Sequence, residues 1–218
     1  PWRRRPSCER VPLFVTLAGD LDRSNDTLKD ENNTTPTITA FPAVENAEAT
    51  TLEFDVFNWV DAVVGEQSWG WQTGNYSNAN QTAALAPLSA THFYLFDSYN
   101  APAGDISRLY SHCLAIPAAG GSNCGYQMSF WMSHDNTTTL PETDSMYVSV
   151  STNKGVTWTR VPVLSTGGGL QRHDAALTAN AAPIWRREVV NLSAYAGQTI
   201  QIGFEGVSKF GNAFGLDD

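Results

Sequence analysis

The stretch Thr199-Ile200-Gln201-Ile202-Gly203-Phe204-Glu205 decides the fold class of this chain. Its apolar residues point to one side of an extended backbone, and the polar or small residues between them point to the other. This period of two is typical of a β-strand that has one face on a hydrophobic core. A second short segment, Gly215-Leu216-Asp217-Asp218, follows and carries two adjacent carboxylates.

The same alternation recurs along most of the chain. Strands are expected at residues 52–56, 91–97, 106–116, 126–132, 146–150, 157–161 and 188–192. Gly, Pro and Asn separate these segments, and we find no convincing helix between them. This pattern predicts an all-β, jelly-roll-like antiparallel β-sandwich.

Two connections have a distinctive composition. Residues 164–183 are rich in Gly and Ala and predict a loop of unusual length. Residues 151–158 resemble an Asp-box with Asn153 in place of the Asp, and Gly155 suits a positive φ. We interpret this segment as a tight hairpin turn, with Trp158 packed under the loop.

The first part of the chain differs from the rest. We predict a flexible N-terminal extension or linker at residues 1–49 and a folded domain at residues 50–218. Within the extension Val11–Leu17 can form one strand, whereas residues 20–37 are nearly all Asp, Asn, Thr, Ser and Lys. The basic run Arg3–Arg5 is a processing site, an arm that reaches an acidic neighbour, or a solvated tail.

Composition narrows the class of partner. The 218 residues carry a formal net charge of −9, and 42% of them are hydrophobic. An acidic body argues against a nucleic-acid partner. No window approaches the roughly 20 apolar residues needed to cross a bilayer, so we expect no membrane insertion.

The cysteines favour an extracellular or cell-surface location, and the glycosylation sequons permit a glycosylated surface without establishing one. Cys113 and Cys124 flank a loop with Pro117 and Gly120-Gly121, and we predict a disulfide between them; two reduced, buried thiols are the alternative. Cys8 is left over. Possible N-glycosylation sites in the predicted domain are Asn75, Asn80, Asn136 and Asn191.

No residue pattern builds an active site. The four histidines lack zinc-binding spacing, and neither His134-Asp135 nor His173-Asp174 accompanies a serine in a nucleophile elbow. We therefore predict that the chain is not an enzyme. Trp69, Trp71 and Tyr76 are candidates for a sugar-stacking platform, although such aromatic residues more often fill a core.

Several segments, in this order, resemble a known group of domains. They are Phe54-Asp55, Trp69-Gly70-Trp71, His92–Asp97, Gly104–Leu109, Cys124 with Met128–Met132, Phe204-Glu205-Gly206 and Leu216-Asp217-Asp218. Together they resemble the MAM-type domains and the bacterial cleaved-adhesin domains. The chain departs from that pattern in lacking paired cysteines near Phe54 and in the long loop at 164–183.

The resemblance implies an extracellular β-sandwich that adheres to other molecules. It also implies a structural Ca²⁺, for which Asp55, Asp97, Asp217 and Asp218 are the predicted ligands. The alternative is that these carboxylates cap separate turns. The family's last strand continues past the acidic pair. We expect that this strand is either lost to cleavage or disorder or supplied by another chain, and an open sheet edge there would suit strand addition.

We therefore predict an adhesion or assembly module that acts through contact with a protein partner or identical subunits. The alternative is a carbohydrate-binding module of a secreted hydrolase, with a glycan as its partner.

Overall fold

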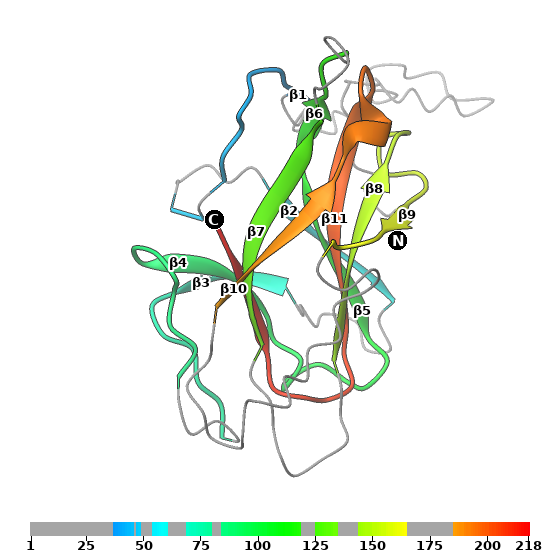
Figure 1. The fold of residues 1–218 in the computed structure, drawn as a ribbon. Helices are drawn as coiled ribbons and strands as arrows, with labels where there is room; N and C mark the ends of the chain where they lie inside the picture. The colour runs from blue at the N-terminus through cyan, green and yellow to red at the C-terminus, as the bar shows by residue number, and fades with distance from the viewer. Residues whose placement is uncertain are drawn as a thin grey trace, which may run out of the picture.

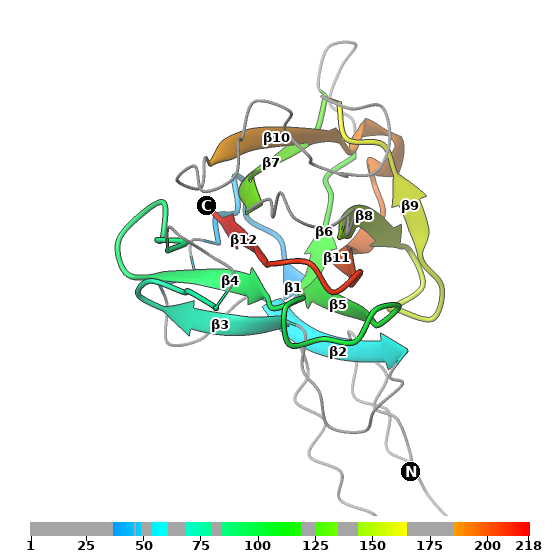
Figure 2. The ribbon, with the colours of Figure 1, turned by 90° about the horizontal axis from the view of Figure 1, so that it is seen from below.

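Two β-sheets form the body of the protein. The computed structural model describes residues 37–45, 47–48, 54–60, 69–79, 84–118, 125–134, 144–164 and 185–218. Figure 1 and Figure 2 show the two layers from perpendicular directions. Apart from one 3₁₀ turn at Ser193–Tyr195, the regular structure of these residues is all strand. The predicted all-β sandwich is thus confirmed.

Sheet A has β11 near its centre. Its order is β2 (Phe54–Val60), β5 (Ile106–Ser111), β11 (Thr199–Val207), β8 (Ser145–Ser151) and β9 (Thr159–Val161), all antiparallel. Beyond β5 the chain enters β6 (Cys113–Ala115), which also pairs with β11. A two-residue strand, β1 (Thr37–Ile38), pairs with β6 in parallel.

Sheet B has β12 at its centre. Its order is β10 (Arg186–Asn191), β7 (Gln127–His134), β12 (Phe214–Asp217), β4 (His92–Phe96) and β3 (Trp69–Thr73), all antiparallel. In Figure 2, β3 and β4 lie side by side and β12 leads to the C-terminus. Across the described ranges, no helix is long and apolar enough to span a membrane.

An aromatic cluster joins the two sheets. Phe96 stacks on Phe214 with ring centroids 4.6 Å apart, and Trp69 meets both rings at 5.3 and 5.4 Å. All three side chains are completely buried. The indole N–H of Trp69 also donates to the backbone carbonyl of Ser107 in sheet A at 3.1 Å. Trp69 therefore fastens sheet B to sheet A as well as filling space between them.

Gly206 lies against this cluster. A Cβ at Gly206 would come within 2.4 to 2.8 Å of three ring atoms of Phe96. Only glycine fits here, because the β11 backbone runs directly over the aromatic ring.

The other face of β11 carries a buried ion pair. Glu205 accepts a hydrogen bond of 2.6 Å from Arg108, and both side chains are at most 5% exposed. Arg160 also binds Glu205, but its side chain is 53% exposed. Burial lowers the pKa of Arg108 to about 10, against the opposing effect of Glu205.

The β8–β9 hairpin confirms the predicted tight turn at 151–158. The Asn153 carboxamide oxygen accepts the Thr157 N–H at 2.8 Å, and the Ser151 hydroxyl oxygen accepts the Gly155 N–H at 2.8 Å. Positive φ values fall at Lys154 and Gly155. Gly155 thus has the positive φ that the sequence predicts, and Lys154 shares that conformation.

Three predictions about elements need correction. The expected strand at 106–116 is divided at His112 into β5 and β6. Strands β3 and β12 were not predicted, because each is short and contains a glycine. Part of the predicted extension belongs to the sandwich: β1 pairs with β6, and Ala47 is 1% exposed within the core cluster. The expected loop at 164–183 lies almost entirely outside the described residues.

Candidate functional site

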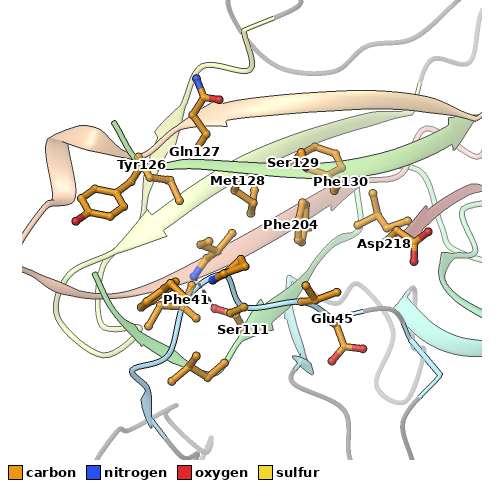
Figure 3. A pocket seen from close by; sticks show the side chains of 18 of the residues that line it. Phe41, Glu45, Ser111, Tyr126, Gln127, Met128, Ser129, Phe130, Phe204 and Asp218 are labelled. Carbon is orange, nitrogen blue, oxygen red and sulfur yellow. Dashed lines mark hydrogen bonds between the residues drawn. The ribbon is translucent and has the colours of Figure 1, made fainter. Parts of the chain in front are cut away.

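A pocket of about 620 Å³ lies between the sheets. Sheet A contributes its wall of Leu109, Leu114, Ile202 and Phe204, and sheet B contributes Tyr94, Met128, Phe130 and Leu216. The segment 41–45 with Ala47 lies along its remaining side. In Figure 3, Phe41 and Asp218 lie toward opposite sides of the pocket, with Phe130 and Phe204 between them. The lining is mostly apolar.

One wall of the pocket comes from β7, which pairs with a strand on each side. On one side, β7 pairs with β10 from Gln127 to Met132. On the other side, it pairs with β12 only from Trp131 to His134, since β12 ends at Asp217 opposite Trp131. The four residues Gln127–Phe130 of β7 line the pocket.

Three carboxylates lie around the pocket: Glu45, Asp217 and Asp218. Asp217 is 4% exposed and accepts the backbone N–H groups of Leu88 and Ser89 at 2.9 and 3.2 Å. Burial raises the pKa of Asp217, and the adjacent charge of Asp218 adds to the rise. The surroundings of the pocket are therefore acidic, in contrast to its walls.

Exposed apolar side chains continue from the pocket onto the surface. Val44 is 76% exposed and Phe41 is 38% exposed, and both line the pocket. Single exposed apolar residues are common, whereas apolar side chains that form a continuous patch beside a groove are found at interaction surfaces.

A polar clamp holds the segment beside the pocket to sheet B. Glu48 accepts hydrogen bonds from the backbone N–H groups of Thr91 and His92 at 2.8 and 2.6 Å, and its other oxygen lies 2.8 Å from His92 Nδ1. The side-chain hydrogen bond with His92, with help from the backbone N–H groups, lowers the pKa of Glu48 to about 2. Trp71 stacks on His92 at 4.2 Å and donates its indole N–H to the carbonyl of Ala47.

The three candidate sugar-binding residues differ in how far their side chains are buried. Trp69 is completely buried. It therefore fills the core, which is the alternative to sugar binding that the sequence left open. Tyr76 donates its hydroxyl to Asp97 at 2.6 Å, and burial followed by this bond raises the pKa of Tyr76. Trp71 is 44% exposed and has a ring face stacked on His92.

The predicted calcium ligands do not lie together in the part of the chain that the structure describes, where no three His, Cys, Asp or Glu side chains form a group able to hold a metal. Asp97 and Asp217 lie beyond opposite ends of the β4–β12 ladder, in which Phe96 is opposite Phe214 and Tyr94 is opposite Leu216. Asp97 accepts from Tyr76 and from Asn100, as a turn cap does. These contacts favour separate caps, whereas the Asp55 side chain is outside the description. The calcium prediction therefore remains untested.

A Ser, His and Asp group is present but is not arranged for catalysis. Ser98 donates its hydroxyl to Asp144 at 2.5 Å, and His134 Nε2 lies 3.8 Å from the same carboxylate. All three side chains are buried. A nucleophilic serine would have to bond to the histidine. Asp144 instead also accepts the backbone N–H groups of Lys209 and Gly211, so the group holds a turn.

The remaining predicted sites are only partly described. Cys113 is fully buried in β6, but Cys124 is outside the described residues, and the pairing remains a prediction. Asn75 and Asn191 are exposed, as glycosylation would require, while Asn80 and Asn136 are outside the description.

Comparison with known proteins concerns the fold. No protein-family model matches the chain, and no curated protein matches it. Similar solved structures include a cleaved adhesin domain of Lys-gingipain from Porphyromonas gingivalis, with 15% identity and a TM-score of 0.49 over 79% of this chain and 92% of that one. A second cleaved adhesin domain of Lys-gingipain has 16% identity and a TM-score of 0.43 over 80% and 93%.

The carbohydrate-binding module TmCBM61, in complex with β-1,4-galactotriose, has 13% identity and a TM-score of 0.42 over 76% of this chain and 84% of that one. The β-sandwich fold of this chain is established by its own two sheets. Such a fold does not specify a function. Membership of the MAM family stays a hypothesis.

The pocket was not foreseen from the sequence. The alternation of Met128 and Phe130 indicated an inward-facing strand, but the sequence does not show which residues of the other sheet lie across from them. That depends on how strands distant in sequence pair and pack.

Proposed function

We propose that this chain is an extracellular adhesion or assembly module that acts by contact with other proteins. The observation that carries the proposal is the apolar pocket between the sheets, adjoined by the exposed side chains of Phe41 and Val44. Deep apolar pockets take apolar side chains of a partner, and burying one such side chain contributes about 1.5–3 kcal/mol. The buried, turn-holding arrangement of Asp144 also supports a non-catalytic role.

Association of the full chain tests this proposal. Sedimentation velocity over a range of concentrations, or binding to an immobilised copy, should detect association of wild-type protein. Val44→Glu should weaken it at least tenfold, because a charge at the pocket opposes burial. Val156→Glu is the matched control, since Val156 is 56% exposed on the β8–β9 turn and does not line the pocket. Equal association of all three proteins would contradict the proposal.

Carbohydrate binding is the second candidate, and Trp71 is the observation in its favour. Its exposed ring and the neighbouring polar groups of His92 and Glu48 resemble the aromatic and polar surfaces that bind sugars. A glycan-array signal that Trp71→Ala abolishes and Val44→Glu preserves would support this function over protein contact.

Further proposals accompany an extracellular module. A Cys113–Cys124 disulfide would be detected as a linked peptide in unreduced digests. Glycans would add mass at Asn75 or Asn191. A structural Ca²⁺ would raise the melting temperature, and a chelator would reverse the rise.

A further inference from the structure

The turn between β11 and β12 presents an aromatic side chain in a backbone conformation that costs stability. Phe210 has a φ of 63°, in the left-handed region, and is 50% exposed. Glycine or asparagine usually takes such a position, because a bulky side chain crowds the backbone there. Backbone strain of this kind persists only where the surroundings impose it, and it is found at sites that bind something.

Hydrogen bonds on both sides of Phe210 impose this conformation. One carboxylate oxygen of Asp144 accepts the backbone N–H of Lys209 at 2.7 Å and that of Gly211 at 3.2 Å. The Phe210 N–H donates to the Ser208 hydroxyl at 3.0 Å. A Cβ at Gly211 would overlap the Asp144 carboxylate, so the glycine of this turn serves that approach. The phenylalanine beside it is held rigidly while half of it faces solvent.

A second ring from another loop lies next to Phe210. Tyr99, in the loop 97–105 between β4 and β5, has its ring centroid 6.4 Å from that of Phe210, with the ring planes 25° from parallel. Stacked carbon atoms approach to about 3.5–4.0 Å, so near-parallel rings at this separation are offset sideways. The Tyr99 N–H donates to the Asn212 carbonyl at 2.8 Å and fixes the two loops to each other. Figure 1 shows the β11–β12 turn, in red, at the lower end of the sandwich.

The groups beside the rings indicate the class of ligand. Asn100 follows Tyr99, Lys209 precedes Phe210, and both are exposed. A small, flat aromatic surface with polar neighbours matches a sugar ring, which has C–H groups on one face and hydroxyl groups around its edge. A stable protein partner would bury about 800 Å² of this chain, far more than two partly buried rings offer. The surface therefore fits a saccharide better than a protein.

We propose that Phe210 and Tyr99 bind the apolar face of a sugar ring at this end of the sandwich. The inference rests on carbohydrate binding, the second candidate function, and adds a site to it. This site lies apart from the pocket, because β12 begins at Phe214, close to the turn, and lines the pocket only at its other end, with Leu216 and Asp217. The strain at Phe210 is the stability given up to present the ring.

Binding of the full chain to a glycan array tests the site, and calorimetry with the best-bound oligosaccharide of the array measures the affinity. Phe210→Leu keeps an apolar side chain but removes the ring face, so it should weaken the affinity at least tenfold. Phe210→Tyr restores the ring and should bind within about twofold of the wild-type protein.

The melting temperature of Phe210→Asn tests the strain. Asparagine tolerates a positive φ, so this variant should lose glycan binding yet melt at the same temperature as the wild-type protein or higher. Val156→Asn is the matched control, because Val156 is 56% exposed on the β8–β9 turn and has no positive φ. The control should bind glycans as the wild-type protein does.

Three results would each overturn the inference: no glycan bound by the wild-type chain, affinity unchanged in Phe210→Leu, or a lower melting temperature for Phe210→Asn than for the wild-type protein. Its failure is distinguishable from failure of the candidate functions. A signal that Trp71→Ala abolishes and Phe210→Leu preserves leaves carbohydrate binding standing at Trp71. Association that Val44→Glu weakens is measured without any glycan, and the proposed protein contact stands or fails on that measurement.

Discussion

Substitution of Gly206 by alanine should destabilise the sandwich more than the single added methyl group suggests. The new Cβ would lie 2.4 Å from Phe96 Cε2 and 2.5 Å from Cδ2. The ring cannot yield freely, because it stacks on Phe214 and abuts Trp69, and none of these side chains is exposed. Overpacking a core costs about 1–3 kcal/mol, and disturbing an aromatic pair adds about 0.5–1.5 kcal/mol.

We therefore expect Gly206→Ala to lower the free energy of unfolding by about 2–4 kcal/mol. For a domain of this size that corresponds to a fall in melting temperature of roughly 5–15 °C. Thermal and urea melts followed by circular dichroism measure both quantities.

Gly70→Ala is the matched control, because no atom lies within 4 Å of its added Cβ and it also lies in a strand. Phe96→Leu should recover part of the loss when combined with Gly206→Ala, so a double-mutant cycle should give a favourable coupling. If Gly206→Ala and the wild-type protein have the same melting temperature, the close approach of β11 to Phe96 is refuted.

Two further perturbations address charged groups. In urea melts, Arg108→Met should lower the free energy of unfolding by about 3–5 kcal/mol, because it leaves Glu205 buried with only the exposed Arg160 as a partner. Arg160→Met should lower it by only about 1 kcal/mol, because the Arg160 side chain is exposed. Equal losses in the two variants would contradict the argument from burial. The stability contributed by Glu48, whose pKa is lowered from 4.5 to about 2, is complete above pH 4.5 and is lost as the pH falls through about 2. The indole N–H resonance of Trp71, assigned with Trp71→Phe, should shift across that range, and Glu48→Gln should shift it already at neutral pH.

Most of the sheet structure followed from local alternation. The prediction of β11 was correct because a strand with one face on the core has a strict period of two, here set by Ile200, Ile202 and Phe204. Strand β12 escaped notice because Phe214–Asp217 offers only four residues, of which one is glycine. Its central place in sheet B results from pairing with β4 and β7, and such partners cannot be identified from the segment alone.

The candidate site was harder to predict for a related reason. Trp69 and Trp71 are two residues apart and both aromatic, yet one is 0% exposed and the other 44%. Asp97 and Asp217, two of the four predicted calcium ligands, lie beyond opposite ends of the β4–β12 ladder, while the calcium prediction itself remains untested. Whether one residue is buried, and whether two residues distant in sequence lie close together, both depend on how the strands pair. The amino-acid composition of a single strand does not determine that pairing.

The indole of Trp69 has a consequence for any ligand of this protein. Since its N–H is bonded to the Ser107 carbonyl of the facing sheet, sliding of one layer over the other would break a buried hydrogen bond. The gap between the layers is therefore held at a set width before anything enters it. A ligand that bound between the layers would meet a preorganised cavity and would lose little affinity to rearrangement of the protein.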